Sequence, residues 1–232
     1  MDSTLDVVKK EIKALLENLY ETVATALERS MKAFEDFDSD LADSITKKAR
    51  YIEKNHHAIE DKIFEAITSH QPRDKELRRF IAYLNTSNGL QSVGRFATKI
   101  AEIVKMSEGL DHFKELITLP YLAELATAAL SISMRAVIDE DLSEIDELEK
   151  LDAQSDSESA DMFQEIANYL GHLRGISNIA MLYVIVGRYF ERTADQAISI
   201  AEYAVFLVTG KRRKLGLAYK GTDDVSDVAI DI

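Results

Sequence analysis

Hydrophobic residues recur along most of this chain at intervals of three and four positions, which is the spacing of one face of an α-helix. Six segments show the pattern, and short polar stretches with the residues typical of helix ends separate them. The sequence therefore predicts an all-α protein with six helices. The predicted helices cover residues 5–34, 39–69, 73–107, 120–138, 142–170 and 173–209.

The predicted helix ends depend on residues with known capping or breaking roles. Asp36 to Ser39 supply turn and N-cap side chains between the first two helices. Pro72 ends the second helix, because the residue before a proline is pushed away from helical dihedral angles. A basic start and an acidic, polar remainder predict a loosely held tail after the sixth helix. The other expected ends are marked by Gly109, Pro120, Gly171 and Gly210.

The last three helices repeat the first three. One block recurs 103 positions later and a second block recurs 100 positions later, in the same order, which indicates an internal duplication. We therefore expect two tandem three-helix bundles at 1–110 and 111–213, followed by a flexible tail at 214–232. The first block is Leu27, Ser30, Met31, Lys32, Ala33 and Asp38, matched by Leu130, Ser133, Met134, Arg135, Ala136 and Asp141. The second block is Ala97, Ile100, Ala101 and Glu102, matched by Ala197, Ile200, Ala201 and Glu202.

Composition supports long helices and narrows the classes of partner. Only 9 glycines and 2 prolines occur in 232 residues, which disfavours a turn-rich β fold. The net charge of −13 argues against nucleic acid as a partner, since phosphate binding needs a basic surface. The chain has no cysteine, so disulfides and thiolate metal sites are excluded. Because residues 1–4 lack a signal-peptide pattern and the longest apolar run, 179–186, is too short to span a bilayer, we expect a cytoplasmic protein.

Two carboxylate pairs in the second half have the spacing that places both members on one helix face. Asp152 and Asp156 are four residues apart in the fifth predicted helix, and Glu191 and Asp195 are four apart in the sixth. Four carboxylates that converge between packed helices need a cation to balance their charge, and helical bundles hold hard metal ions in this way. The alternative is a solvated surface, because several such pairs arise by chance among 41 acidic residues.

Two other clusters carry weaker signals. Glu53 and His56 resemble half of a ferritin-like di-iron motif, with His57 and Glu60 nearby, but the second half is missing. We therefore interpret the two histidines as part of a solvated helix face. The basic run from Lys211 to Lys214 could contact anionic lipid, although a basic helix end explains it as well.

An ordered set of motifs resembles the PhoU family and covers about residues 5–213. Phe190–Asp195, Ile200–Tyr203 and Val208–Arg212 match the family pattern in the second half. The first half contributes Ala33-Phe34, Asp38, Leu41-Ala42, Ile63-Phe64, Gln71-Pro72 and Glu76–Arg78. The resemblance implies two three-helix bundles side by side, and an accessory protein that regulates phosphate uptake rather than an enzyme.

The resemblance also implies partners and a cofactor. Family members are associated with the Pst phosphate ABC transporter, whose ATPase subunit is the expected contact, and in many bacteria with a membrane sensor kinase. They are commonly homodimers, and some hold multinuclear metal clusters through acidic pairs on two helices of each repeat. That pattern carries over to Asp152, Asp156, Glu191 and Asp195, with iron favoured and zinc, manganese, magnesium or calcium as alternatives.

The first half departs from this metal pattern. By the two offsets, the four acids correspond to Ala49, Glu53, Gln91 and Arg95. Since three of the four carboxylates are replaced, we infer that the first repeat does not bind the cluster. We expect Arg95 to pair with Glu53 across the two helices, so that a guanidinium takes the place of the metal.

Three other functions stay open at the level of sequence. The first is a metal-dependent enzyme on a carboxylate-lined bundle, which the absence of histidine near the four acids disfavours. The second is a purely structural helical module with acidic surface residues. The third is an accessory protein of a low-affinity phosphate permease, which shares the fold.

Overall fold

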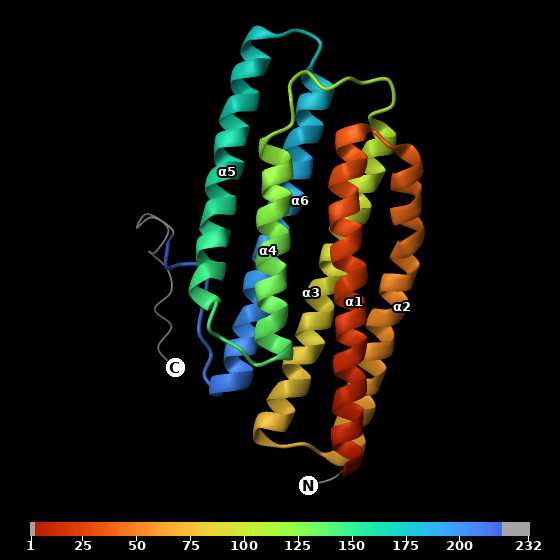
Figure 1. Cartoon of the computed structure of the whole chain (residues 1–232), viewed down its shortest axis with the longest axis vertical. Coiled ribbons are helices and arrows are strands. Elements are labelled where there is room, and N and C mark those ends of the chain that lie inside the picture. The colour runs from red at the N-terminus through yellow and green to blue at the C-terminus, as the bar shows by residue number, and fades with distance from the viewer. Residues whose placement is uncertain (1–2, 220–232) are drawn as a thin grey trace.

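The computed structural model describes residues 3–219, and over this part it consists of six α-helices and their connections (Figure 1). The helices are α1 (Ser3–Asp36), α2 (Ser39–His70), α3 (Asp74–Met106), α4 (Thr118–Ile138), α5 (Ile145–His172) and α6 (Ser177–Thr209). No strand occurs among the described residues. The predicted all-α fold with six helices is confirmed.

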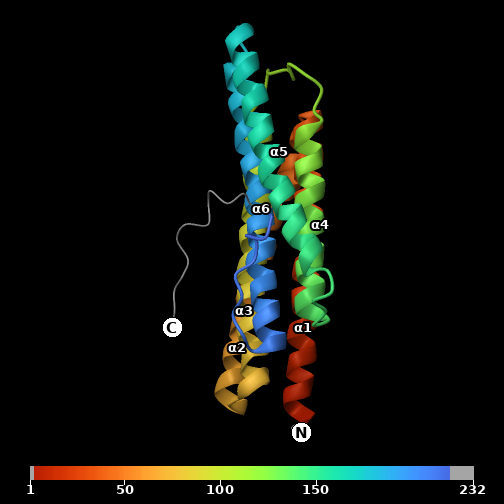
Figure 2. The same cartoon turned by 90° about the vertical axis from the view of Figure 1, so that its left-hand side faces the viewer.

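The helices form two bundles of three that lie side by side along the long axis of the molecule (Figures 1 and 2). Helices α1, α2 and α3 contact one another in the first bundle, and α4, α5 and α6 do so in the second. The two bundles meet mainly where α3 packs against α6, and also where α1 packs against α4. The core therefore runs continuously from one repeat into the other.

Equivalent residues of the two repeats make the same contacts. The Ser30 hydroxyl donates to the Leu27 carbonyl at 2.7 Å, and the Ser133 hydroxyl donates to the Leu130 carbonyl at 2.8 Å, in α1 and α4 respectively. Both serines are fully buried, so this back-bond satisfies their hydroxyls. Ile100 and its counterpart Ile200 are likewise both buried. The internal repeat that residue matching predicts is thus present in three dimensions.

Most predicted helix ends are confirmed, and the two marked by Pro120 and Gly171 are wrong, since α4 begins at Thr118. The Asp38 carboxylate accepts from the Leu41 N–H at 2.8 Å as the N-cap of α2, and Gln71 ends that helix in a left-handed conformation. Gly210 ends α6 in the same way, with φ of 73°. Gly171, however, lies inside α5 and does not break it. The chain turns instead after His172, around Gly175, whose φ of 84° suits a residue without a Cβ atom.

The connection between the repeats, residues 107–117, is anchored by His112. Its Nε2 donates to the Glu35 carbonyl at 3.0 Å, and its Nδ1 lies 2.7 Å from the Tyr183 hydroxyl. The imidazole ring also stacks on Phe37, with ring centroids 4.1 Å apart. Because Glu35 belongs to α1 and Tyr183 to α6, this side chain joins the first repeat to the second. Burial raises the pKa of the Tyr183 phenol, so it is a neutral partner.

Helix α4 is long and apolar enough to pass a composition test for a membrane span. Over its most apolar 18-residue window, however, 56% is buried against the rest of the protein. Its buried face includes Leu122, Ala126 and Leu130, which pack in the shared core. We interpret α4 as a core helix of the second repeat.

The chain after α6 folds back along α5 as far as Tyr219 (Figure 2). Leu215 is 2% exposed, and its N–H donates to Glu202 at 3.0 Å. The Tyr219 hydroxyl donates to Asp146 of α5. Residues 211–219, which we call the C-terminal strap, are therefore held by several contacts and not loosely attached as the composition predicts. The rest of the predicted flexible tail, 220–232, lies outside the described residues.

Candidate functional site

Two of the four predicted ligands line one hollow between α5 and α6. Asp156 of α5 and Glu191 of α6 are half-buried and face a cavity of about 400 Å³, together with Ser159. The Ser159 hydroxyl donates to Glu191 Oε2 at 3.1 Å. Two carboxylates and a hydroxyl form an oxygen-donor set, which is the kind that hard divalent cations and iron accept.

An arginine lies in the same hollow. Arg188, one turn before Glu191 on α6, forms an ion pair with that carboxylate. Its guanidinium therefore provides part of the positive charge that a metal would bring to the site. A metal ion bound to Glu191 must compete with this pair, and exposure of the arginine side chain (53%) leaves it room to move into solvent.

The other two predicted ligands have different surroundings. Asp152 is 2% exposed and lies beneath the C-terminal strap, where a Cβ atom on Gly216 would stand only 3.0 Å from its Oδ2 atom. Asp195 is exposed at the surface of α6. The structure thus brings Asp156 and Glu191 together in one cavity, and it places Asp152 under the strap and Asp195 outside. The four-residue metal site remains a prediction.

A buried carboxylate that the sequence analysis missed lies one turn before Asp152. Glu149 is 4% exposed and accepts two hydrogen bonds from the strap, each 3.1 Å long, from the Arg213 guanidinium and the Gly216 N–H. The signal in the sequence is its i, i+3 spacing from Asp152, which places both on one helix face. Of the basic residues after α6, Arg213 thus pairs with Glu149 and Lys214 pairs with Glu202 of α6.

The first repeat has a matching hollow with different chemistry. Ala49, Glu53, Gln91 and Arg95, the counterparts of the four acids, all line a cavity of about 180 Å³ between α2 and α3. The predicted ion pair between Glu53 and Arg95 does not form among the described residues. Arg95 donates instead to Ser92 at 3.2 Å, within its own helix. Both side chains are exposed, so water offsets their charges and a direct contact gains little.

The interpretation of both histidines as solvated is wrong for His56. This residue is 4% exposed, and its Nδ1 atom lies 2.9 Å from the Ser87 hydroxyl of α3. Burial lowers the pKa of its imidazole, which favours the neutral form. His57 is exposed, as expected.

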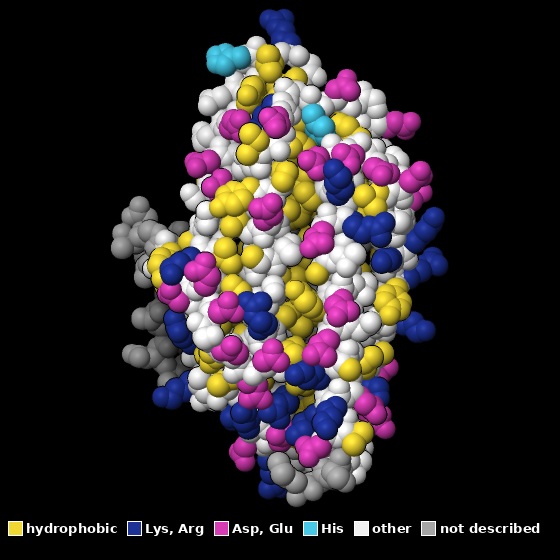
Figure 3. Space-filling model, viewed as in Figure 1, with side chains coloured by type: hydrophobic (Ala, Val, Ile, Leu, Met, Phe, Trp, Pro, Cys, Tyr) yellow, Lys and Arg dark blue, Asp and Glu magenta, His cyan; other side chains and the backbone are white. Residues whose placement is uncertain are grey.

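A third hollow, of about 580 Å³, lies between α1 and α4. Met31, Pro120 and Ala123 contribute apolar surface to it, while Glu28 and Glu124 add negative charge. Figure 3 shows hydrophobic side chains gathered along this junction of the two repeats, with acidic and basic groups on both sides.

Comparison with known proteins places this geometry in a family. The sequence pattern of the PhoU domain matches residues 16–104 and again residues 119–204, which are the two repeats described above. The chain belongs to the PhoU family. The two PhoU domains together cover most of the six helices.

Individual relatives align with most of the chain. A "phosphate-specific transport system accessory protein PhoU homolog" of Clostridium acetobutylicum is 26% identical over 78% of this chain and 84% of its own length. A homologue from Thermotoga maritima is 24% identical over 90% and 89%. Crystal structures of PhoU from Streptococcus pneumoniae (TM-score 0.82, 22% identity, 91% of this chain and 100% of that one) and Pseudomonas aeruginosa (0.83, 20%, 89% and 99%) share the fold.

Proposed function

We propose that this protein is a cytoplasmic accessory regulator of phosphate uptake that acts through contacts with other proteins. The observation that carries the proposal is the match of both repeats to the PhoU domain, in a chain that aligns over most of its length with phosphate transport accessory proteins. The proposed partner is the ATPase subunit of a phosphate ABC transporter, with a membrane sensor kinase as a second contact. The hollow between α1 and α4 combines apolar side chains with Glu28 and Glu124, and such a concave surface could receive a part of another protein.

A metal site in the second repeat forms part of this proposal. Asp156, Glu191 and the Ser159 hydroxyl supply oxygen donors in one cavity, and this chemistry fits iron, manganese, magnesium, calcium or zinc. Asp152 and Asp195 would complete the set on either side. Bound metal would fix α5 against α6 and so set the shape that the second repeat offers to a partner.

The regulator role is tested by a pull-down with purified proteins. The tagged full-length chain is incubated with the ATPase subunit of the phosphate ABC transporter from the same organism, and beside it with the ATPase subunit of an unrelated ABC transporter. We expect selective retention of the phosphate subunit. Equal retention of both subunits, or of neither, would contradict the proposal.

The same preparations, purified without chelator, report on the metal site. Metal content is measured by mass spectrometry for the wild type and for the Asp156→Ala and Asp195→Ala variants. The matched control is Asp161→Ala, which removes an exposed acid from the same helix α5. We expect the first two variants to lose most of the metal and the control to keep it. Equal metal in all four proteins would remove the metal site from the proposal and leave the partner contact standing.

A further inference from the structure

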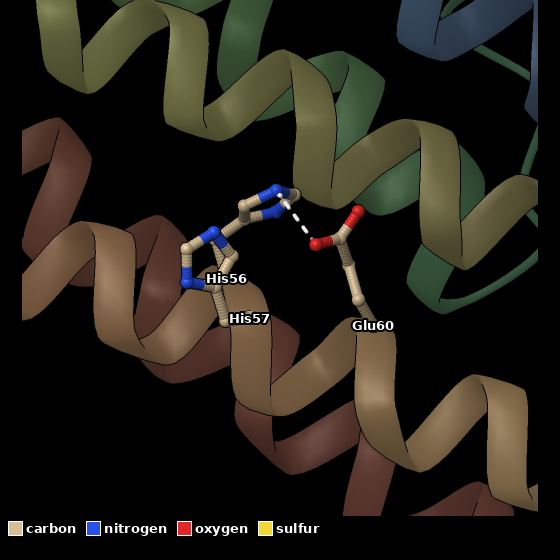
Figure 4. Close-up of side chains that lie close together, drawn as sticks. All are labelled: His56, His57 and Glu60. Atoms are coloured by element: carbon tan, nitrogen blue, oxygen red, sulfur yellow. Dashed lines mark ion pairs between the residues drawn. The ribbon is translucent and has the colours of Figure 1, made fainter.

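The described residues contain a second group of metal-ligand side chains, in the first repeat, where three of the four acids are replaced. His56, His57 and Glu60 lie on one turn of α2, and each offers a ligand atom within 4.8 Å of the other two. Figure 4 shows the two imidazole rings side by side, with the Glu60 carboxylate directed toward His56. The His56 Nε2 atom is 3.3 Å from Glu60 Oε2, and the two ring centroids are 5.4 Å apart.

The buried histidine is held in an orientation that suits metal binding. The His56 Nδ1 atom meets the Ser87 hydroxyl of α3 at 2.9 Å, so its Nε2 atom is the one left for a metal, and that atom faces Glu60. A histidine that binds metal through one nitrogen normally has its other nitrogen fixed by a hydrogen bond of this kind. Ser87 is fully buried, which fixes the ring from the core side.

The other two ligands are free to adjust. His57 is exposed and the Glu60 side chain is 40% exposed. Ligand atoms around one tetrahedral zinc ion, bound at about 2.0–2.1 Å, are separated by about 3.4 Å. Rotation of the His57 and Glu60 side chains toward the fixed His56 would bring the three ligand atoms from within 4.8 Å of one another to this spacing. Two imidazoles and one carboxylate then leave the fourth position open to water.

The position of this cluster in the repeat is informative. By the 103-residue offset, its three residues correspond to Ser159, Ala160 and Phe163. All three of these line the hollow beside Asp156 and Glu191 in the second repeat. The same helix face therefore borders a candidate site in both repeats, but the first repeat supplies nitrogen donors where the second supplies oxygen.

The charged side chains around His56 are compatible with a bound cation, because negative charges outnumber positive ones there. Glu53 and Glu60 contribute negative charge near His56, and Arg95 contributes a positive charge. Arg95 is exposed and bonded to Ser92, so it does not fill the space between the three ligands. From these contacts we propose that His56, His57 and Glu60 form a binding site for a divalent transition metal, with zinc as the best fit, distinct from the carboxylate site of the second repeat.

Titration of the chelator-treated full-length chain with Co²⁺ and then Zn²⁺ tests this site. We expect Co²⁺ to give visible absorption bands of a four- or five-coordinate nitrogen-containing site, which Zn²⁺ then displaces. His57→Ala removes an exposed ligand without disturbing the core, and it should weaken Zn²⁺ binding at least about tenfold. Ser87→Ala should also weaken binding about tenfold, because the hydroxyl positions the His56 ring.

Two controls separate this site from other histidines and from the second repeat. His172→Ala removes an exposed histidine at the end of α5 and should leave the bands and the affinity unchanged. Asp156→Ala should keep the bands of the nitrogen-containing site as well, even if it removes metal from the other site. Wild-type affinity in His57→Ala, or loss of the cobalt bands in Asp156→Ala, would overturn the proposal.

Discussion

At the scale of single residues, Glu149 is a buried carboxylate near the candidate site whose hydrogen bonds come from the C-terminal strap. A buried carboxylate is unfavourable unless hydrogen bonds replace its lost water, and the strap provides two of them, from Arg213 and Gly216. Arg213 is itself 58% exposed, whereas the Glu149 side chain is 4% exposed. Loss of this contact would therefore cost the buried Glu149 carboxylate more free energy than the exposed Arg213 guanidinium, which water can still solvate.

Replacing Arg213 by alanine should destabilise the protein. The change leaves Glu149 buried with only the Gly216 N–H as a donor, so we expect the free energy of unfolding to fall by about 1–2 kcal/mol. Urea unfolding followed by circular dichroism measures it. Lys211→Ala, which truncates an exposed side chain on the same segment, should stay within about 0.5 kcal/mol of wild type. Identical curves for Arg213→Ala and wild type would mean that the strap does not stabilise Glu149.

Part of the residue-level picture could be predicted from the sequence. His56 lies at helical spacing from the apolar residues Ile52, Ile59 and Ile63. Its burial on their face of the helix was therefore predictable from the sequence. The hydrogen bond between His56 and Ser87 was not predictable, because it depends on how α2 and α3 are aligned along their axes. The path of the strap over Asp152 depends in the same way on tertiary contacts.

At the scale of elements, the six helices were predictable because each has a continuous apolar face and clear end signals. The failures lie at the ends. Gly171 lacks a side chain but can adopt helical angles, so one glycine near a terminus was not enough to end α5. Pro120 lies within the first turn of α4 but not at its first residue, because Thr118 and Leu119 extend the helix backward.

The close contact between α3 and α6 leaves no room for a side chain at Gly89. A Cβ atom there would lie 2.9 Å from two side-chain carbons of Ile200, which is closer than packing allows. Gly89→Val should therefore lower the free energy of unfolding by about 1–2 kcal/mol, through overpacking between the repeats. Gly171→Ala is the matched control, because nothing lies within 4 Å of its added carbon, and it should raise stability by about 0.5 kcal/mol. A neutral or stabilising valine at position 89, measured by thermal unfolding, would show that the two helices separate easily.

At the scale of the whole molecule, the two repeats share a scaffold and differ in their chemistry. A hollow lies beside α2 and α3 in the first repeat, and another lies beside the equivalent pair α5 and α6 in the second. The two repeats therefore share the hollow as well as the helices. The sequence predicted that the acids belong to the second repeat, since the offsets show which were replaced. It could not predict that only Asp156 and Glu191 share one cavity, because their relative depth depends on the packing of α5 against α6.

A charge network joins the repeats at the end of the molecule where α3 begins. Arg79 of α3 contacts Glu76 at 2.6 Å and Glu140, in the connection after α4, at 2.5 Å. Lys75 also contacts Glu140 at 2.6 Å, and Lys9 of α1 contacts Glu76 at 2.9 Å. Burial alone would raise the pKa of Glu140, but hydrogen bonds from Lys75 and Arg79 hold it below its ordinary value. The folded state therefore favours the charged carboxylate.

Removal of the Glu140 charge should lower the free energy of unfolding, by an amount that depends on pH. Because the pKa of Glu140 is lower in the folded than in the unfolded chain, its stabilisation is complete above the ordinary pKa of 4.5 and is lost as the pH falls through the folded value. Glu140→Gln should lower the free energy of unfolding by about 1 kcal/mol at pH 7, and the difference from wild type should shrink as the pH falls below about 4.5. Urea unfolding at a series of pH values measures both proteins. Glu108→Gln, an exposed glutamate in the connection between the repeats, should follow the wild-type curve throughout. A Glu140→Gln deficit that persists undiminished in acid would mean that the contact depends on shape and not on charge, and the two repeats would then be joined mainly by the apolar packing of α3 on α6.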